Sequence, residues 1–213
     1  MRKVSWLTVW MVGGWALMRC TQAPQAPQAE TKEAQQVQSV AAGTVLQVDG
    51  QKSEVKAIGT KVTGRHEVRF PIKEASLSVG EGGCLSGGKV TWDLAQLQVL
   101  DLEGEKKAKL EGHLKSPDFF DVEKHPEGVF EITGCEKGVG DTLYLSGNLT
   151  LRGVTKNIRF PAVVRYEGNT LSGKANFNIN RQEWGIAYKG MPDDLIRDEV
   201  NIQLDITAVA PSQ

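Results

Sequence analysis

The amino-acid sequence predicts an all-β domain, either a sandwich or a barrel. From Gly43 onward apolar and polar residues alternate, so that each run has one apolar face. The runs are bounded by Gly, Asn or Asp, which favour turns, and hardly any helical pattern separates them. Short strands at such spacing are typical of sandwiches and barrels. The predicted strands lie at 68–72, 75–79, 90–94, 129–132, 143–151, 158–164, 171–179 and 200–208.

Residues 1–20 are expected to be an export signal. Arg2-Lys3 form a basic start, and the apolar run Val4–Met18 is short for a helix that spans a membrane. Cys20 stands where a bacterial lipoprotein signal places its lipidated cysteine, although Arg19 departs from the small residue preferred there. The sequence therefore predicts export. Lipidation of Cys20 is one form of it, and a plain signal peptide or an uncut anchor is the alternative.

Residues 21–42 are expected to be a disordered linker between this signal and a barrel domain at 43–213. The segment repeats Gln-Ala-Pro and contains no aromatic residue. Such a composition cannot bury enough apolar surface to offset the entropy lost on ordering. A tether that holds a domain away from a membrane would have this composition, and so would a plain disordered N-terminus.

The charge balance argues against nucleic acid as a partner. The chain has 25 Lys and Arg against 26 Asp and Glu, a net charge of -1. An electrostatic nucleic-acid binder would need a basic face. The remaining composition is that of an ordinary globular protein and does not identify a ligand.

The stretch His113–Ile132 predicts a short helical segment near Ser116–Phe120, followed by a strand. Ser116 is a typical N-cap residue, Pro117 suits a first helical position, and the two adjacent phenylalanines need burial. Two irregular connections, 94–114 and 184–198, are long enough to cap an open barrel end and frame a cavity.

Four places in the chain resemble the motifs of one family. They are HLKSPDFFDVEKHPEGVFEI at His113–Ile132, GNLTLRGVTKNIRF at Gly147–Phe160, NRQEWGI at Asn180–Ile186, and DEV at Asp198–Val200. Together they are similar to the YceI-like family, periplasmic lipocalin-like proteins that bind polyisoprenoids. The resemblance implies an antiparallel lipocalin-like β-barrel of about eight strands. It also implies a periplasmic or envelope location and an apolar tunnel for an isoprenoid lipid, polyprenyl or quinone-like.

Residues on the apolar face of the strands are the candidates for lining such a tunnel. For each of these residues, packing in the core is the default interpretation, and contact with a ligand is the more specific one. Arg181 shares the face of Ile179, and inside the barrel it would need a carboxylate, phosphate or carbonyl partner. A surface position at the strand end is the alternative. The predicted ligand-binding residues are Phe70, Trp92, Phe119, Phe120, Phe130, Leu145, Leu149, Phe160, Phe177, Ile179, Arg181 and Trp184.

Catalytic and metal-binding patterns are weak, so neither an enzyme nor a cofactor is expected. His66, His113 and His125 are the only histidines, and none has a ligand-type spacing to another His or Cys. The favoured hypothesis is an envelope protein that stores or carries an isoprenoid lipid. The alternative is a structural or protein-interaction domain of the envelope with a solid core.

Cys84 and Cys135 form an even pair in a compartment that permits disulfides. If their strands are antiparallel neighbours, the two sulfur atoms come within bonding reach. Counting residues along the strands places the two cysteines on opposite faces, unless a bulge at Gly87-Gly88 intervenes. The sequence is compatible with either a disulfide between Cys84 and Cys135 or two free buried thiols.

Overall fold

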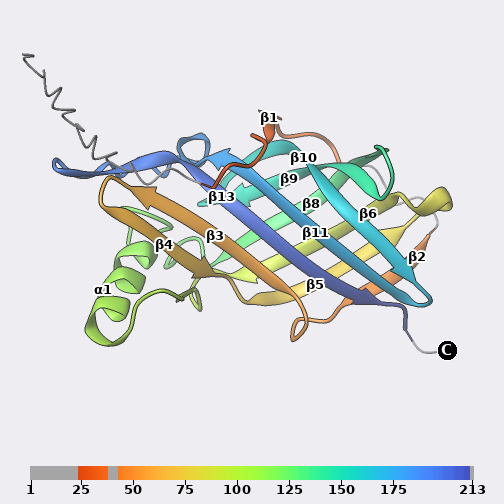
Figure 1. The fold of residues 1–213 in the computed structure, drawn as a ribbon, viewed down its shortest axis with the longest axis horizontal. Helices are drawn as coiled ribbons and strands as arrows, with labels where there is room; N and C mark the ends of the chain where they lie inside the picture. Colours follow the sequence, from red (N-terminus) through yellow and green to blue (C-terminus); the bar gives the residue numbers. More distant parts are fainter. Residues whose placement is uncertain (1–23, 38–42, 212–213) are drawn as a thin grey trace, which may run out of the picture.

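A computed structural model describes residues 24–37 and 43–211 of the chain (Figure 1). It contains an α-helix, α1 (Gly104–Lys115), and two short 3₁₀ turns, η1 (Glu81–Gly83) and η2 (Arg181–Trp184). The strands are β1 (Glu30–Glu33), β2 (Thr44–Val48), β3 (Glu54–Lys61), β4 (Gly64–Arg69), β5 (Ile72–Val79), β6 (Leu85–Asp93), β7 (Gln98–Val99), β8 (Glu127–Lys137), β9 (Thr142–Leu151), β10 (Val154–Glu167), β11 (Thr170–Asn180), β12 (Gly190–Met191) and β13 (Asp194–Val209).

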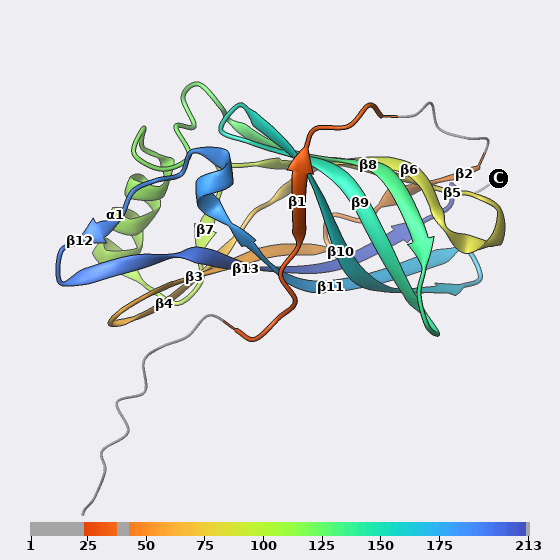
Figure 2. The ribbon, with the colours of Figure 1, turned by 90° about the horizontal axis from the view of Figure 1, so that it is seen from above.

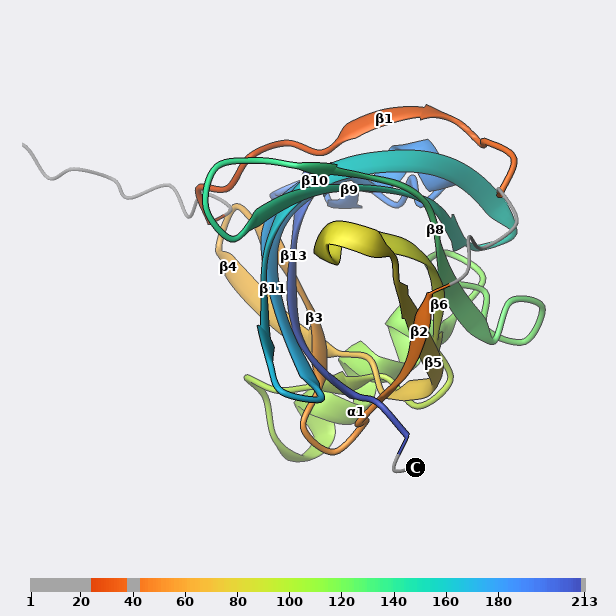
Figure 3. The same cartoon turned by 90° about the vertical axis from the view of Figure 1, so that its right-hand side faces the viewer.

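The sheet closes into an antiparallel barrel. Its ring runs β2-β5-β6-β8-β9-β10-β11-β13 and returns to β2 through the pairing of Ala208 with Val48. Figure 3 shows this ring of eight strands end-on. Strands β3, β4 and β7 continue from β13 at the end of the barrel where α1 lies. The barrel expected from the resemblance is therefore present.

The alternation of side chains explains how the barrel encloses its core. In β11, Phe177 and Ile179 are buried and pair with Ile202 and Val200 of β13. Because successive side chains point to opposite faces of a strand, one apolar set from each strand fills the interior. The buried apolar residues accordingly form one continuous cluster inside the ring.

The helix lies before Ser116 instead of beginning there. Helix α1 ends at Lys115, and both the backbone N–H and the hydroxyl of Ser116 donate to the carbonyl oxygen of His113. Ser116 therefore caps the C-terminus of a helix, and Ser116–Phe120 forms turns. The sequence did not predict α1 because Leu114 is the one buried side chain of this helix, which leaves little apolar periodicity in its sequence.

Residues 24–37, named here the N-terminal strap, lie against the barrel wall, which corrects the expected disorder for this part of the linker. Strand β11 pairs with β10 only from Ala162 onward, and β1 pairs with β10 over Lys156–Arg159. The backbone of Ala29 donates to the carbonyl oxygen of Asn178 in β11. The strap thus fills a seam between two strands (Figure 2), and these backbone hydrogen bonds offset its ordering entropy. The expected signal at 1–20 lies outside the described residues.

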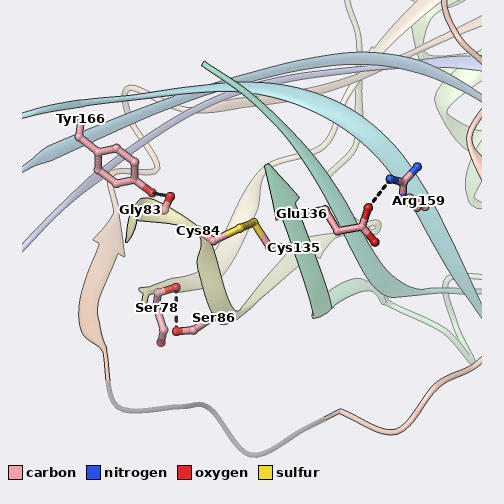
Figure 4. Close-up of a disulfide and its surroundings, with 8 residues drawn as sticks. All are labelled: Ser78, Gly83, Cys84, Ser86, Cys135, Glu136, Arg159 and Tyr166. Carbon is pink, nitrogen blue, oxygen red and sulfur yellow. Dashed lines mark hydrogen bonds and ion pairs between the residues drawn. A yellow bond between two sulfur atoms is a disulfide. The ribbon is translucent and has the colours of Figure 1, made fainter. Parts of the chain in front are cut away.

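The structure joins Cys84 and Cys135 by a disulfide, with Cα atoms 5.9 Å apart (Figure 4). Strands β6 and β8 are antiparallel neighbours. The register of β8 shifts after Ile132, and that of β6 shifts between Gly87 and Leu85, so the simple count of faces does not hold. The Tyr166 hydroxyl also donates to the Gly83 carbonyl at 2.8 Å, which further holds the turn at this end of the barrel.

Candidate functional site

The barrel encloses an apolar cavity of about 170 Å³. Its wall is contributed by every large strand of the domain except β2 and β5, together with the C-terminal part of α1. Arg181 is the one charged residue among the described residues of the wall. The lining residues are Val55, Ala57, Gly59, Val68, Phe70, Val90, Trp92, Leu94, Leu114, Phe119, Phe120, Phe130, Leu149, Leu151, Ile158, Phe160, Phe177, Ile179, Arg181, Ile186, Val200, Ile202, Leu204 and Ile206.

Aromatic rings fill the middle of the barrel. Phe160 stacks on Phe177 with ring centroids 4.1 Å apart, and Phe130 lies 5.6 Å from Phe160. The free volume that remains resembles that of an engineered cavity of about 150 Å³ that binds benzene. Ligand pockets usually hold roughly 300–1,000 Å³. The cavity therefore takes a group about the size of one isoprene unit, and a longer chain requires the rings to move.

A second aromatic cluster closes the cavity at the α1 end. Phe120 lies edge-on to Phe70, with centroids 5.8 Å apart, and Phe119 lies 5.2 Å from Phe120. The backbone N–H of Phe120 donates to the carbonyl oxygen of Leu114, which ties this turn to the end of α1. Because Phe119 is only partly buried, this turn forms the boundary between the cavity and solvent.

Arg181 is inside the barrel end, and each of its three guanidinium nitrogens donates to the protein. The side chain is 3% exposed, and it donates to the carbonyl oxygens of Ile186, Ile196 and Arg197. One guanidinium nitrogen lies 3.0 Å from the carboxylate of Asp198. Burial lowers the pKa of the Arg181 guanidinium, while the attraction of Asp198 opposes that shift. The sequence predicts that a buried Arg181 has a carboxylate, phosphate or carbonyl partner, and Asp198 is its carboxylate partner. A ligand phosphate is therefore not needed to neutralise the charge of Arg181.

Ten of the twelve predicted ligand-binding residues line the cavity. Leu145 is buried in the core but lies outside the lining. Trp184 is also outside it, fully buried, with its indole N–H donating to the carbonyl oxygen of Leu149 at 2.9 Å. Trp184 thus fixes η2 against β9, and the structure gives it a packing role.

Sequence reasoning missed the contribution of β3 and β13 to the wall. Val55, Ala57 and Gly59 line the cavity from β3, where buried Ile58 and Thr60 on the other face obscure the alternation. In β13 the alternating residues from Val200 to Ile206 were recognised as a strand, but their apolar set was not assigned to the ligand. The alternation of apolar and polar residues in β13 was enough to predict that its apolar set faces the cavity.

The histidines are not gathered into a metal site within the described residues. No group of three or more His, Cys, Asp or Glu side chains that could hold a metal ion occurs there. His66 lies 2.8 Å from Asp101 at the surface. Burial raises the pKa of the Asp101 carboxyl, but hydrogen bonds from the Glu67 backbone and His66 outweigh it, and the pKa lies below its usual value.

A membrane-spanning helix is also absent from the part of the chain that the structure describes. None of its helices is both long and apolar enough to cross a bilayer.

Comparisons with known proteins place the fold in a defined group. A family model described as a YceI-like domain matches residues 46–208. A UPF0312 protein of Pseudomonas syringae pv. tomato is 30% identical over 185 residues, which cover 79% of this chain and 93% of the relative. The structure of Burkholderia cenocepacia BcnA is similar, with a TM-score of 0.66, 22% identity, and coverage of 76% of this chain and 99% of that chain.

A second solved structure is described as a polyisoprenoid-binding domain from Saccharophagus degradans implicated in plant cell wall breakdown. It is similar with a TM-score of 0.61 and 14% identity, and the match covers 80% of this chain and all of that domain. At this level of identity, the likeness to both solved structures concerns the fold.

Proposed function

This chain belongs to the YceI-like family, and from that premise we propose that its barrel binds one isoprenoid-type lipid, polyprenyl or quinone-like, for storage or transport. The observation that carries the proposal is the cavity, whose wall is apolar except for Arg181. Because each guanidinium nitrogen of Arg181 already donates to a protein oxygen, the site selects for an apolar group. The polyisoprenoid-binding domain with the same fold supports the class of ligand.

The energetics of such binding rest on apolar burial. Each buried methylene contributes about 0.8 kcal/mol, so an isoprenoid chain binds without any charged contact. One isoprene unit fits the cavity of about 170 Å³. We propose that a longer tail enters by displacing the stacked rings of Phe160 and Phe177, which changes side-chain rotamers and leaves the barrel wall intact.

The volume of the cavity favours one alternative, a structural or protein-interaction domain with a solid core. Its volume is below the roughly 300 Å³ at which ligand pockets begin. The two proposals differ in what the purified protein carries. A lipid carrier from a bacterial host retains lipid, whereas a solid-core domain retains none.

We propose binding instead of catalysis because the cavity brings no acid, base or nucleophile together. The one charged side chain of its described wall is Arg181, which donates to backbone carbonyls and to Asp198. An apolar wall of this kind excludes water and orients no reactive group. The proposed function accordingly needs no cofactor.

We also propose that the protein works in the periplasm or elsewhere in the cell envelope, where Cys20 is its lipid anchor. The basic start and the short apolar run before Cys20 support export. Metabolic labelling with palmitate, compared between the wild type and Cys20→Ala, tests the anchor. Label that is lost in the variant is the expected result, and label in neither protein rejects the lipoprotein form.

The test of lipid binding is extraction of the purified protein with organic solvent, followed by mass spectrometry. The expected result is an isoprenoid lipid in the wild type and its loss in Phe177→Asp, provided that circular dichroism shows a folded barrel. Ser86→Asp is a matched control, because Ser86 is on the disulfide-bearing end and outside the cavity. A wild-type protein without lipid contradicts the proposal.

A further inference from the structure

Three exposed apolar side chains lie on two neighbouring turns at the α1 end of the barrel. Val62 is 60%, Met191 63% and Leu195 49% exposed. They are neighbours because the Val62 backbone donates to the carbonyl oxygen of Leu195, and the hairpin of β12 and β13 pairs Met191 with Asp194. We call these three residues the apolar tip. Val62 and Leu195 lie opposite each other on one face of these turns, and Met191, opposite Asp194, lies on the other, so the end of the hairpin is apolar on both faces.

The two turns are held by specific bonds. Asp194 forms an ion pair with Lys61 and accepts hydrogen bonds from the backbone and hydroxyl of Thr63 at 3.1 and 2.9 Å. The hydrogen bond from Lys61 lowers the pKa of the Asp194 carboxyl, so the pair stays charged at neutral pH. The protein thus supports the apolar tip with a defined hairpin that presents it to solvent.

The cavity reaches the base of the same hairpin. Arg181 and Ile186 line the cavity, and Arg181 donates to the carbonyl oxygens of Ile196 and Arg197. Leu195 of the apolar tip directly precedes Ile196. The tip therefore lies beside the end of the barrel at which Arg181 and Ile186 line the cavity.

The N-terminal strap begins at this end as well. The side-chain amide of Asn178 donates to the carbonyl oxygens of Pro24 and Ala26, at 3.4 and 3.3 Å. Pro24 shares a surface groove with Ile196 and Arg197. Only three residues lie between Cys20 and Pro24 in the sequence, so the chain can span at most about 14 Å from one to the other. A docked strap consequently limits how far position 20 can lie from the groove that Pro24 shares with Ile196.

We infer that the α1 end of the barrel is a docking surface for a lipid bilayer, with the apolar tip inserted into the interface. This inference rests on the proposed lipid-binding function and extends it, because the bilayer is the source of the ligand. Two features support a bilayer as the occupant. The proposed anchor at Cys20 is tethered within about 14 Å of Pro24, which lies in the groove with Ile196, and Arg181 and Ile186 line the cavity beside this hairpin. The opposite end carries the disulfide and the exposed Val139.

The experiment places a tryptophan at each end of the full-length protein, as Met191→Trp and, as the matched control, Val139→Trp, which replaces a side chain that is 93% exposed. Each variant is mixed with vesicles of phosphatidylethanolamine and phosphatidylglycerol that contain brominated acyl chains. The fluorescence of the parent protein is subtracted. We expect bromine to quench Met191→Trp at low and at high salt, and to leave Val139→Trp unchanged. Equal quenching of both variants, or none of Met191→Trp, overturns the inference.

A second variant separates this inference from the proposed function. The triple change Val62→Ser, Met191→Ser and Leu195→Ser removes the apolar tip at exposed positions, so the barrel stays folded. Both proteins in the vesicle assay carry Cys20→Ala, which removes the proposed anchor. In this background the triple change should weaken vesicle binding roughly ten-fold or more. The lipid extracted from the triple variant should equal that of the wild type. Unchanged vesicle binding contradicts the docking surface, whereas absence of lipid from the wild type contradicts the proposed function alone.

Discussion

Gly59 offers a way to fill the cavity without disturbing the barrel. It lies in β3 and lines the cavity, and a Cβ atom built on it meets no heavy atom within 4 Å. Gly59→Leu therefore places four carbon atoms in a space of about 170 Å³, which holds roughly one benzene-sized group. We predict that the variant is as stable as the wild type or more stable, by up to about 2 kcal/mol, because a leucine side chain becomes buried.

The assay is thermal unfolding with and without added geranylgeraniol, an isoprenoid alcohol. At a ligand concentration of about 100 Kd, binding stabilises the wild type by about 2.7 kcal/mol. We predict no such gain for Gly59→Leu. Gly50→Leu is the matched control, because Gly50 is exposed and a Cβ there also meets nothing within 4 Å. A full ligand-induced gain in Gly59→Leu would refute the assignment of the cavity as the binding site.

Three further predictions concern the bonds that hold the barrel. The disulfide closes a loop of 51 residues, so Cys84→Ser with Cys135→Ser should lower the free energy of unfolding by about 4 kcal/mol, measured by urea denaturation; equal stability, with both thiols alkylated in unreduced wild type, argues against the bridge. Arg181→Met should cost about 3 kcal/mol or more in the same assay, because several buried carbonyls lose their donor. Asn148→Ala removes the two hydrogen bonds to the Gln35 backbone, and limited proteolysis should then cleave the strap faster than in the wild type; unchanged cleavage would show that these bonds do not hold it.

The strands were predictable wherever one face is buried and the other is wet. The alternation around Phe177 and Ile202 identified β11 and β13 because those residues pair across the sheet and point into the core. Strand β3 was not predicted, since Ile58 is buried on its outer face and breaks the alternation. The strap was missed for a different reason. Backbone hydrogen bonds hold β1 to β10, and they leave no pattern in the side chains.

The sequence predicts which side chains face the interior of the barrel, but it does not predict the volume of the cavity between them. Strand alternation placed Phe130, Phe160 and Phe177 inside the barrel, where the structure has them. It could not show that their rings stack and fill the middle of the cavity, because that depends on distances across the barrel. Trp184 was predicted to line the cavity as a large apolar residue, but it lies in η2, and its indole N–H donates to the Leu149 carbonyl of β9.

The central claim is that an isoprenoid lipid lies inside the barrel, and photo-crosslinking tests it most directly. The purified full-length protein is illuminated with a diazirine-bearing geranylgeraniol, and the labelled peptides are identified by mass spectrometry. We predict label on the peptides that contain Trp92, Phe160 and Phe177, in amounts that unlabelled geranylgeraniol reduces by competition. Label confined to peptides of the outer surface, or label that competition does not reduce, would contradict the claim.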